Sequence, residues 1–255
     1  MKILAIGDVT SPGGVAHLCK SLWGVRQKFG IDFCVVNGEN ASVVSGISPA
    51  QAEELLRSGA DVITGGNHTM QNFSIHEALD NTGDVLRPIN YGAAAPGRGY
   101  SIIDTGAHRV LVINAMGQAM IEPTLDSPYP YIDAALSECR GKYDFSVLDF
   151  HAEATGEKLC LAHSYDGVIN VVFGTHTHVP TADCTVLPKG TGYVTDLGMC
   201  GESGGILGMD IPGVMRKVRA RMPGKLKAAD GAPFADGVIF ELVGAKCTSV
   251  KRIKF

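Results

Sequence analysis

Short runs of apolar residues recur along the first two thirds of the chain, and each ends at a polar residue or a glycine. Such near-continuous apolar runs are typical of strands that are buried on both faces of a sheet. Amphipathic segments between them predict helices, and Ser48 followed by Pro49 is a typical helix start. We therefore expect strands at residues 2–7, 32–37, 61–64, 109–114, 145–150 and 168–173, and helices at 15–29, 48–58, 74–81, 129–139 and 212–222.

The last third of the chain has a different pattern, in which short β-rich segments are joined by glycine-rich turns. This pattern predicts antiparallel strands that complete a second sheet, at residues 185–187, 192–195, 237–243 and 248–255. Residues 201–213 are rich in glycine and predict a mobile loop. The chain shows no internal repeat and no convincing interdomain linker, so we expect one α/β domain over residues 1–255.

Composition narrows the class of protein. Of the 255 residues, 45% are hydrophobic and 19% are charged, which fits a globular chain with a sizeable core. The net charge of −4 argues against a strongly basic nucleic-acid surface. No apolar run reaches the roughly 18 residues of a membrane helix, and the start of the chain lacks a signal-peptide pattern. The seven scattered cysteines are typical of reduced thiols, and we expect a cytoplasmic protein.

Metal-capable side chains recur at the points where the predicted strands end, often beside glycine. The carboxyl ends of strands line one crevice in an open α/β sheet, so these side chains are expected to converge although they lie far apart in sequence. His176 and His178 are two residues apart and would share one face of a regular strand. The candidates are Asp8, Glu39, Asn40, Asn67, His68, His151, His176 and His178.

The donor types indicate transition metals. Two carboxylates, amide oxygens and several imidazoles suit manganese, iron, zinc or cobalt rather than calcium, and no thiolate is needed. The set is too large for one tetrahedral zinc site, so it predicts two ions that share a bridging carboxylate. Such a pair, about 3.5–4 Å apart, clamps a phosphoryl oxygen and generates a hydroxide.

Three motifs occur in order along the chain: Gly7-Asp8, then Gly66-Asn67-His68, then Gly174-Thr175-His176-Thr177-His178. They resemble the hallmarks of the calcineurin-like metallophosphoesterases. Further segments at residues 37–41, 151–155, 175–183 and 195–199 resemble the YmdB-type bacterial phosphodiesterase subfamily, and this likeness covers nearly the whole chain. The superfamily's D-x-H motif is Asp8-Val9-Thr10 here, and Asn40 would supply an oxygen in place of the histidine.

The resemblance implies a four-layer α/β/β/α sandwich, in which two packed mixed sheets are flanked by helices and the site lies at the strand ends. It implies a di-metal phosphodiesterase that hydrolyses small cyclic nucleotides, both 2′,3′-cyclic and 3′,5′-cyclic. Its two metals, iron or manganese with zinc also compatible, are held by two ligand sets that share Glu39 as the bridge, and His68 would donate a proton to the leaving oxygen. One set is Asp8, Glu39, Asn40 and His178, and the other is Glu39, Asn67, His151 and His176.

The mechanism that we expect is in-line attack by a metal-bridging hydroxide, with charge stabilisation by the two ions. Glu153 and Asp196 are candidates to orient His151 or another imidazole. The remaining histidines, His17, His76, His108 and His163, are expected to serve packing or the surface.

Alternative functions stay open at this point. One is a phosphomonoesterase such as a nucleotidase, because pocket shape rather than the metals separates these activities. Another is a regulatory protein that acts mainly by binding a partner, with catalysis secondary. The basic residues 216–221 are expected to form a solvated helix face, with phosphate or RNA as the other interpretation. An edge strand or the glycine-rich loop leaves room for a homo-oligomer.

Overall fold

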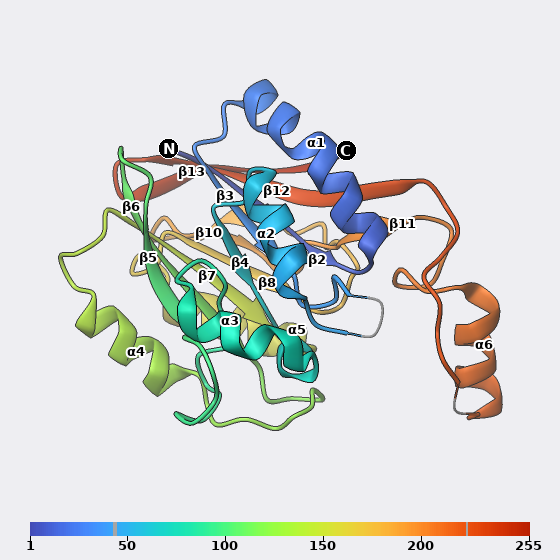
Figure 1. Ribbon diagram of the computed structural model, residues 1–255. Helices are drawn as coiled ribbons and strands as arrows, with labels where there is room; N and C mark the ends of the chain where they lie inside the picture. Colours follow the sequence, from blue (N-terminus) through green and yellow to red (C-terminus); the bar gives the residue numbers. More distant parts are fainter. Residues whose placement is uncertain (43–44, 223) are drawn as a thin grey trace.

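The computed structural model describes residues 1–42, 45–222 and 224–255. Two β-sheets pack face to face, and helices cover the outer face of each sheet (Figure 1). This is the four-layer arrangement that the family resemblance implied. Across the described ranges, none of the helices combines the length and the apolar character that crossing a bilayer requires.

The first sheet has seven strands, and the parallel strands β1, β3 and β4 form one side of it. On the other side β12 runs antiparallel to β1, and both β11 and β13 pair with β12. The short strand β2 pairs in parallel with β11. The bounds are β1 Lys2–Ile6, β2 Asp8–Val9, β3 Phe33–Asn37, β4 Val62–Thr64, β11 Met199–Glu202, β12 Pro233–Val243 and β13 Lys246–Lys254.

The second sheet has six strands in the order β5-β6-β7-β8-β10-β9. Its centre is parallel, from β6 through β7 and β8 to β10, and an antiparallel strand closes each edge. The bounds are β5 Tyr100–Asp104, β6 Arg109–Met116, β7 Phe145–His151, β8 Val171–Thr175, β9 Thr185–Val186 and β10 Gly192–Val194.

Three apolar clusters hold the layers together. The middle cluster lies between the sheets and contains Val35, Val112 and Phe240 among others. The other two join the first sheet to α1, α2 and α3, and the second sheet to α4 and α5. The helices are α1 Pro12–Phe29, α2 Pro49–Arg57, the 3-10 turns η1 Thr69–Gln71 and η2 Phe73–Ile75, α3 His76–Asn81, α4 Tyr129–Glu138, α5 Thr155–Ser164 and α6 Ile211–Ala220.

The expected strands and helices of the first two thirds are all present, with ends shifted by up to three residues. Ser48 caps α2 as predicted, because its side chain accepts the N–H of Gln51 and the side chain of Gln51 bonds back. The sequence pattern missed α5, β5 and the short strands β2 and β11. Helix α5 lacks a side-chain cap and has a weak amphipathic pattern, so its start signal is poor.

The assignment of all late strands to the second sheet was wrong. β12 and β13 belong to the first sheet, where β12 lies directly beside β1, whereas β9 and β10 belong to the second. β10 is also parallel to β8 rather than antiparallel, because the chain passes along the outer edge as β9 before it turns back between them. Sequence periodicity identifies strands but not the neighbours with which they pair.

The predicted glycine-rich loop at residues 201–213 contains regular structure at both ends, namely the last residues of β11 and the start of α6. Residues 203–222 and 224–232, which we call the α6 arm, lie between the end of β11 and the start of β12. The arm projects from the side of the sandwich (Figure 1). At its root the N–H of Ser203 donates to the carbonyl of Ala232 (3.0 Å).

Candidate metal centre

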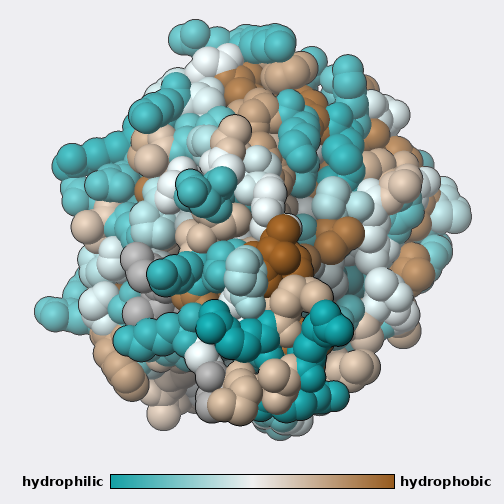
Figure 2. All heavy atoms as spheres, turned by 90° about the vertical axis from the view of Figure 1, so that its right-hand side faces the viewer, coloured by the Kyte–Doolittle hydropathy of each residue, from teal (hydrophilic) through white to brown (hydrophobic). Residues whose placement is uncertain are grey.

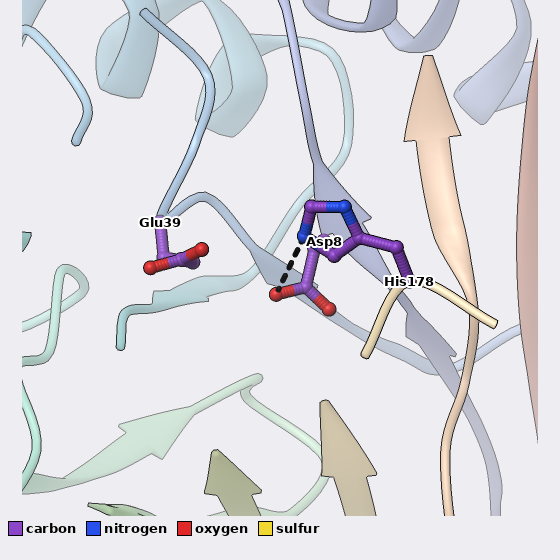
Figure 3. A group of neighbouring side chains, drawn as sticks. All are labelled: Asp8, Glu39 and His178. Carbon is purple, nitrogen blue, oxygen red and sulfur yellow. Dashed lines mark ion pairs between the residues drawn. The ribbon is translucent and has the colours of Figure 1, made fainter. Parts of the chain in front are cut away.

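The predicted side chains come from strand ends of both sheets and meet at one edge of the sandwich. Asp8 lies in β2, Glu39 and Asn67 follow β3 and β4, His151 ends β7, and the two late histidines follow β8. Ligand atoms of Asp8, Glu39 and His178 all lie within 4.8 Å of one another. In Figure 3 the imidazole of His178 reaches Asp8 from one side, and Glu39 lies on the other side.

Two carboxylates are enclosed here, and in the described part of the chain neither forms an ion pair with a lysine or an arginine. Asp8 and Glu39 are 0% and 1% exposed. Burial, and then the charges of Glu39 and Asp196, raise the pKa of Asp8 well above its usual range. Burial likewise raises the pKa of Glu39 to about 7. Among the described residues Asp8 Oδ1 has no hydrogen-bond partner, although it is fully buried. An unpaired buried oxygen of this kind is costly and points to a missing cation.

His151 is the centre of a second group of donor atoms. Its Nε2 lies 2.9 Å from Asn67 Oδ1 and 3.1 Å from His176 Nδ1. The same nitrogen is 3.6 Å from Glu39 Oε2, and the other ring nitrogen is 3.6 Å from Asp8 Oδ1. The fold therefore brings together Glu39, Asn67, His151 and His176, which is one of the two expected ligand sets.

The hydrogen-bond network assigns the proton on each ring. The hydroxyl of Thr175 donates to Asp149 (2.7 Å), so its oxygen accepts from His151 Nδ1 (3.0 Å). Burial lowers the pKa of His151 well below its usual range, and burial likewise lowers the pKa of His176 to about 4. Both rings are therefore neutral and carry one proton each.

The single proton of His176 belongs on Nε2, which lies 3.2 Å from Glu153 Oε2. The atoms that face one another, His151 Nε2, His176 Nδ1 and Asn67 Oδ1, consequently present only lone pairs. Separations of about 3 Å are those of adjacent ligands bound at about 2.1 Å to one metal ion. This donor set fits a transition-metal ion. The three atoms cannot form hydrogen bonds with one another, because none of them carries a proton, and a shared metal ion would account for their close approach.

His178 is oriented by the α6 arm. Its Nδ1 lies 3.2 Å from the carbonyl oxygen of Leu207, which can only accept, so the proton is on Nδ1. Its Nε2 is thereby left free and lies 3.8 Å from Asp8 Oδ1. Burial lowers the pKa of this ring too, which keeps it neutral and able to bind a metal.

The expectation that His176 and His178 share a face of a regular strand was wrong. Strand β8 ends at Thr175, and φ is 99° at His176 and 61° at His178. Both residues therefore lie in a tight turn with left-handed backbone, which costs energy for residues other than glycine. The turn points the two rings at different groups of donors, whereas a strand would have placed them side by side.

Glycines precede two of the histidine motifs because the backbone there approaches other parts of the site. A Cβ on Gly66 would collide with the imidazole of His151, and one on Gly174 would collide with the carbonyl of Thr195. Only a residue without a side chain fits at either position. The glycines are thus part of the packing around the ligands.

His68 lies beside this cluster, half-buried, on the wall of a cavity of about 710 Å³. Its backbone N–H donates to Glu39 Oε2 (3.1 Å). Its Nδ1 donates to Gln71 Oε1 (3.0 Å), an oxygen that also accepts from Ser45 (2.9 Å). Nε2 has no such partner within the described part of the chain and remains available to a substrate. Asn40 contacts Glu39 through its amide nitrogen, and its role as a ligand stays a prediction.

Two further groups support the ligands. Glu153 contacts His176, as expected for an orienting carboxylate. Within the described ranges Asp196 forms no hydrogen bond or ion pair with an imidazole, so the expectation that it orients one was wrong. Instead its Oδ2 accepts from Lys158 Nζ (2.7 Å) and from the N–H of Thr177 (3.2 Å), so that it holds the turn between the two histidines.

Sequence reasoning missed Asp149, which is fully buried and accepts hydrogen bonds from Asn37, Thr64 and Thr175. An acidic residue inside the apolar run 145–150 was the available signal. It missed Leu207 and Gln71 as well, since no side-chain pattern marks a carbonyl or a single amide. His17, His76 and His108 serve packing as expected, through Phe255, Met70 and Phe145.

Comparison with known proteins gives a consistent result. A family model described as YmdB-like protein matches residues 4–253. A Bacillus subtilis protein named 2′,3′-cyclic-nucleotide 2′-phosphodiesterase is 37% identical over 242 residues, which are 95% of this chain and 91% of that protein.

Two solved structures share the whole fold. A hypothetical protein from Thermus thermophilus matches with a TM-score of 0.93 and 33% identity, and the match covers 100% of this chain and 99% of the other. A structure described as a novel phosphatase from Mycoplasma pneumoniae matches with a TM-score of 0.92 and 29% identity, over 100% and 93% of the two chains. The family resemblance and the sandwich architecture expected from the sequence are confirmed.

Proposed function

This chain belongs to the YmdB-like family and is a phosphoric diester hydrolase, and from that premise we propose that it is a di-metal enzyme acting on small 2′,3′-cyclic nucleotides. The observation that carries the proposal is the convergence of lone pairs around His151 Nε2 beside the unpaired Asp8 Oδ1. Buried neutral imidazoles and carboxylates whose lone pairs face one another are unfavourable unless they bind cations.

The family implies divalent metal ions, and the residues present fit two of them. Asp8, Glu39, Asn40 and His178 would hold one ion, and Glu39, Asn67, His151 and His176 would hold the other. We propose iron or manganese, with zinc as the alternative, because the donors are nitrogen and oxygen only. When bound, such a pair supplies Lewis-acid polarisation of the phosphoryl group and a nucleophile at neutral pH.

His68 is the proton donor in this proposal. Gln71 accepts the Nδ1 proton and so fixes the ring, which leaves Nε2 to face the cavity. In the doubly protonated ring, Nε2–H donates to the alkoxide as the phosphorus–oxygen bond breaks. General acid catalysis of this kind is typically worth about 10²–10⁴-fold in rate.

The substrate part of the proposal comes from the bacterial relative, whose name specifies 2′,3′-cyclic nucleotides. Whether 3′,5′-cyclic nucleotides are also hydrolysed depends on the same cavity. The relative from Mycoplasma pneumoniae is described as a phosphatase, so hydrolysis of monoesters is the second candidate. We place this activity in the cytoplasm, where the seven free cysteines remain reduced.

The testing experiment measures metal content and hydrolysis on the wild type and on Asp8→Asn. We expect about two ions per chain in the wild type and cleavage of 2′,3′-cyclic AMP and bis-p-nitrophenyl phosphate. Asp8→Asn removes a charged ligand while it keeps the shape, so metal occupancy and diester cleavage should fall together. A matched control is Asp32→Asn, a surface carboxylate remote from the site.

The outcomes separate the candidates. Cleavage of p-nitrophenyl phosphate alone, with two metals bound, would move the assignment to a phosphomonoesterase. Metals without hydrolysis of any of these substrates would favour a regulatory role through a binding partner. A chain that binds no iron, manganese or zinc would contradict the metal centre itself.

A further inference from the structure

The α6 arm forms one wall of the active-site cavity. Lys217 from α6 and Lys225 beyond it line the cavity opposite Glu39 and His68, together with the apolar side chains of Leu207, Met209 and Leu226. The arm is joined directly to the metal centre, because the Leu207 carbonyl accepts from His178. Figure 2 looks onto the side of the molecule on which α6 lies, and it shows hydrophilic side chains gathered beside apolar ones there.

A second hollow of about 260 Å³ lies in the arm itself. The two share Lys217 and Lys225, and the outer hollow adds Arg216. A basic path therefore runs from the metal centre across the two shared lysines to Arg216. Its inner end is where the reacting phosphate must lie.

Cationic side chains predominate among the residues that line the outer hollow. None of the described residues that line it is acidic, and in the described ranges its three cationic side chains form no ion pair. Backbone hydrogen bonds from Lys227 (3.1 Å) and Gly213 (2.9 Å), and then the charges of Lys227 and Arg216, lower the pKa of Asp210, so this carboxylate offsets part of the charge of Arg216. Three exposed cations around a small hollow form a site for an anion.

Hydrogen bonds fix the backbone of the segment that carries these side chains. Asp210 caps the N-terminus of α6 and ties it to Lys227, and the N–H of Ala229 donates to the carbonyl of Gly208 (2.8 Å). As expected from the sequence, residues 216–221 are exposed, and Arg216 and Lys217 also line the hollows. Arg219, on the same helix, lines neither of them.

We propose that the outer hollow binds a second, non-reacting phosphate, so that the preferred substrate is a short oligoribonucleotide ending in a 2′,3′-cyclic phosphate. The inference rests on the proposed function and names its substrate class. The terminal cyclic phosphate lies at the metal centre, the apolar residues of the arm contact the terminal nucleoside, and the preceding phosphate contacts Arg216, Lys217 and Lys225. Cationic grooves that follow the backbone are typical of sites for single-stranded nucleic acid.

The test compares kcat/KM for 2′,3′-cyclic AMP with kcat/KM for a triribonucleotide that ends in a 2′,3′-cyclic phosphate, using the metal-loaded full chain. We expect the wild type to prefer the trinucleotide by tenfold or more. The triple variant Arg216→Ala, Lys217→Ala, Lys225→Ala should lose about tenfold or more of that preference, since each cation contributes a charge-assisted contact. Arg219→Ala is the matched control and should keep the wild-type ratio.

Salt dependence gives a second readout that does not need a variant. The KM for the trinucleotide should rise with salt more steeply than the KM for the mononucleotide, because each neutralised backbone phosphate releases a counterion. Direct binding can be followed by fluorescence anisotropy of a labelled trinucleotide that ends in a 3′-phosphate. The triple variant should bind it at least tenfold more weakly than Arg219→Ala does.

Failure of this inference is distinguishable from failure of the proposed function. Equal kcat/KM for the two substrates, with equal salt dependence and an unchanged ratio in the triple variant, would overturn the phosphate subsite while the diesterase stands. Hydrolysis of neither substrate by a metal-loaded chain would overturn both.

Discussion

At the scale of single residues, the candidate metal centre depends on which nitrogen of each imidazole carries the proton. Thr175, Glu153 and the Leu207 carbonyl take the N–H of His151, His176 and His178, respectively. The other nitrogen of each ring, Nε2 of His151 and His178 and Nδ1 of His176, is thereby left without a proton. Partners of this kind fix the tautomer and ring orientation of metal ligands, and their loss typically costs 10–100-fold in affinity or activity.

The first residue-scale prediction concerns His68. His68→Ala should keep the metal content and lower turnover of 2′,3′-cyclic AMP by about 10²–10⁴-fold, because its alkoxide leaving group needs a proton. Turnover of bis-p-nitrophenyl phosphate should fall much less, since nitrophenolate leaves unprotonated. Gln71→Ala should show the same substrate pattern with a loss of about 3–10-fold, as expected for one lost hydrogen bond. Steady-state kinetics with metal analysis checks this.

Two results would contradict these roles. If His68→Ala lost the metals, His68 would be a ligand and not an acid. If Gln71→Ala slowed both substrates equally, the glutamine would support the loop rather than orient the ring.

At the scale of elements, α5 anchors the turn that carries two of the predicted ligands. Lys158 lies in α5 with 1% of its side chain exposed, and its Nζ donates to the Thr175 carbonyl (2.8 Å) and to Asp196 (2.7 Å). Asp196 in turn accepts the N–H of Thr177. The helix, the end of β8 and the histidine turn are thereby joined by one buried ion pair.

The prediction for this element follows from the cost of an unpaired buried charge. Lys158→Met should lower the free energy of unfolding by about 3–5 kcal/mol, because Asp196 is left buried without its partner. The double variant Lys158→Met, Asp196→Asn should recover part of that loss, as the uncompensated charge is gone. Urea denaturation of both variants checks this, and a double variant less stable than Lys158→Met would contradict the account.

At the scale of the whole molecule, an apolar layer joins the two sheets. At the candidate site, by contrast, buried ionisable side chains from both sheets come together. Asp8 and Glu39 come from the first sheet, and His151 and Asp149 from the second. The raised pKa values of Asp8 and Glu39 show that their charged forms are disfavoured by the fold alone. Cations at this edge would therefore connect the sheets as well as catalyse.

The whole-molecule prediction concerns removal of the metals. The chelated protein should unfold at a lower temperature than the protein saturated with Mn²⁺. A ligand at 100 times its Kd stabilises the native state by about 2.7 kcal/mol, or about 5–10 °C in Tm for a chain of this size. Calorimetry on the two forms checks this. The difference should shrink in Asp8→Asn, and an equal Tm for chelated and loaded wild type would be the contrary result.

Most of the helices and strands, and the candidate ligands, could be predicted from the amino-acid pattern alone. Apolar runs take turns with amphipathic segments along the chain, and both indicate which residues are buried. Because burial follows locally from residue type, the strands from β1 to β8 were predicted, apart from β2 and β5. The ligand candidates were predicted because strand ends in such sheets face one crevice, wherever they lie in the chain.

Other features depend on the three-dimensional fold. They are the sheet partners of β10 and β12, the left-handed turn at His176 and His178, and the buried hydrogen bonds of Asp149 and Lys158. Strand pairing depends on contacts between residues far apart in sequence, which periodicity does not encode. The same holds for the arm. The basic residues 216–221 are visible in the sequence, but the hollow forms only because Lys225, from the returning part of the chain, lines it together with Arg216 and Lys217.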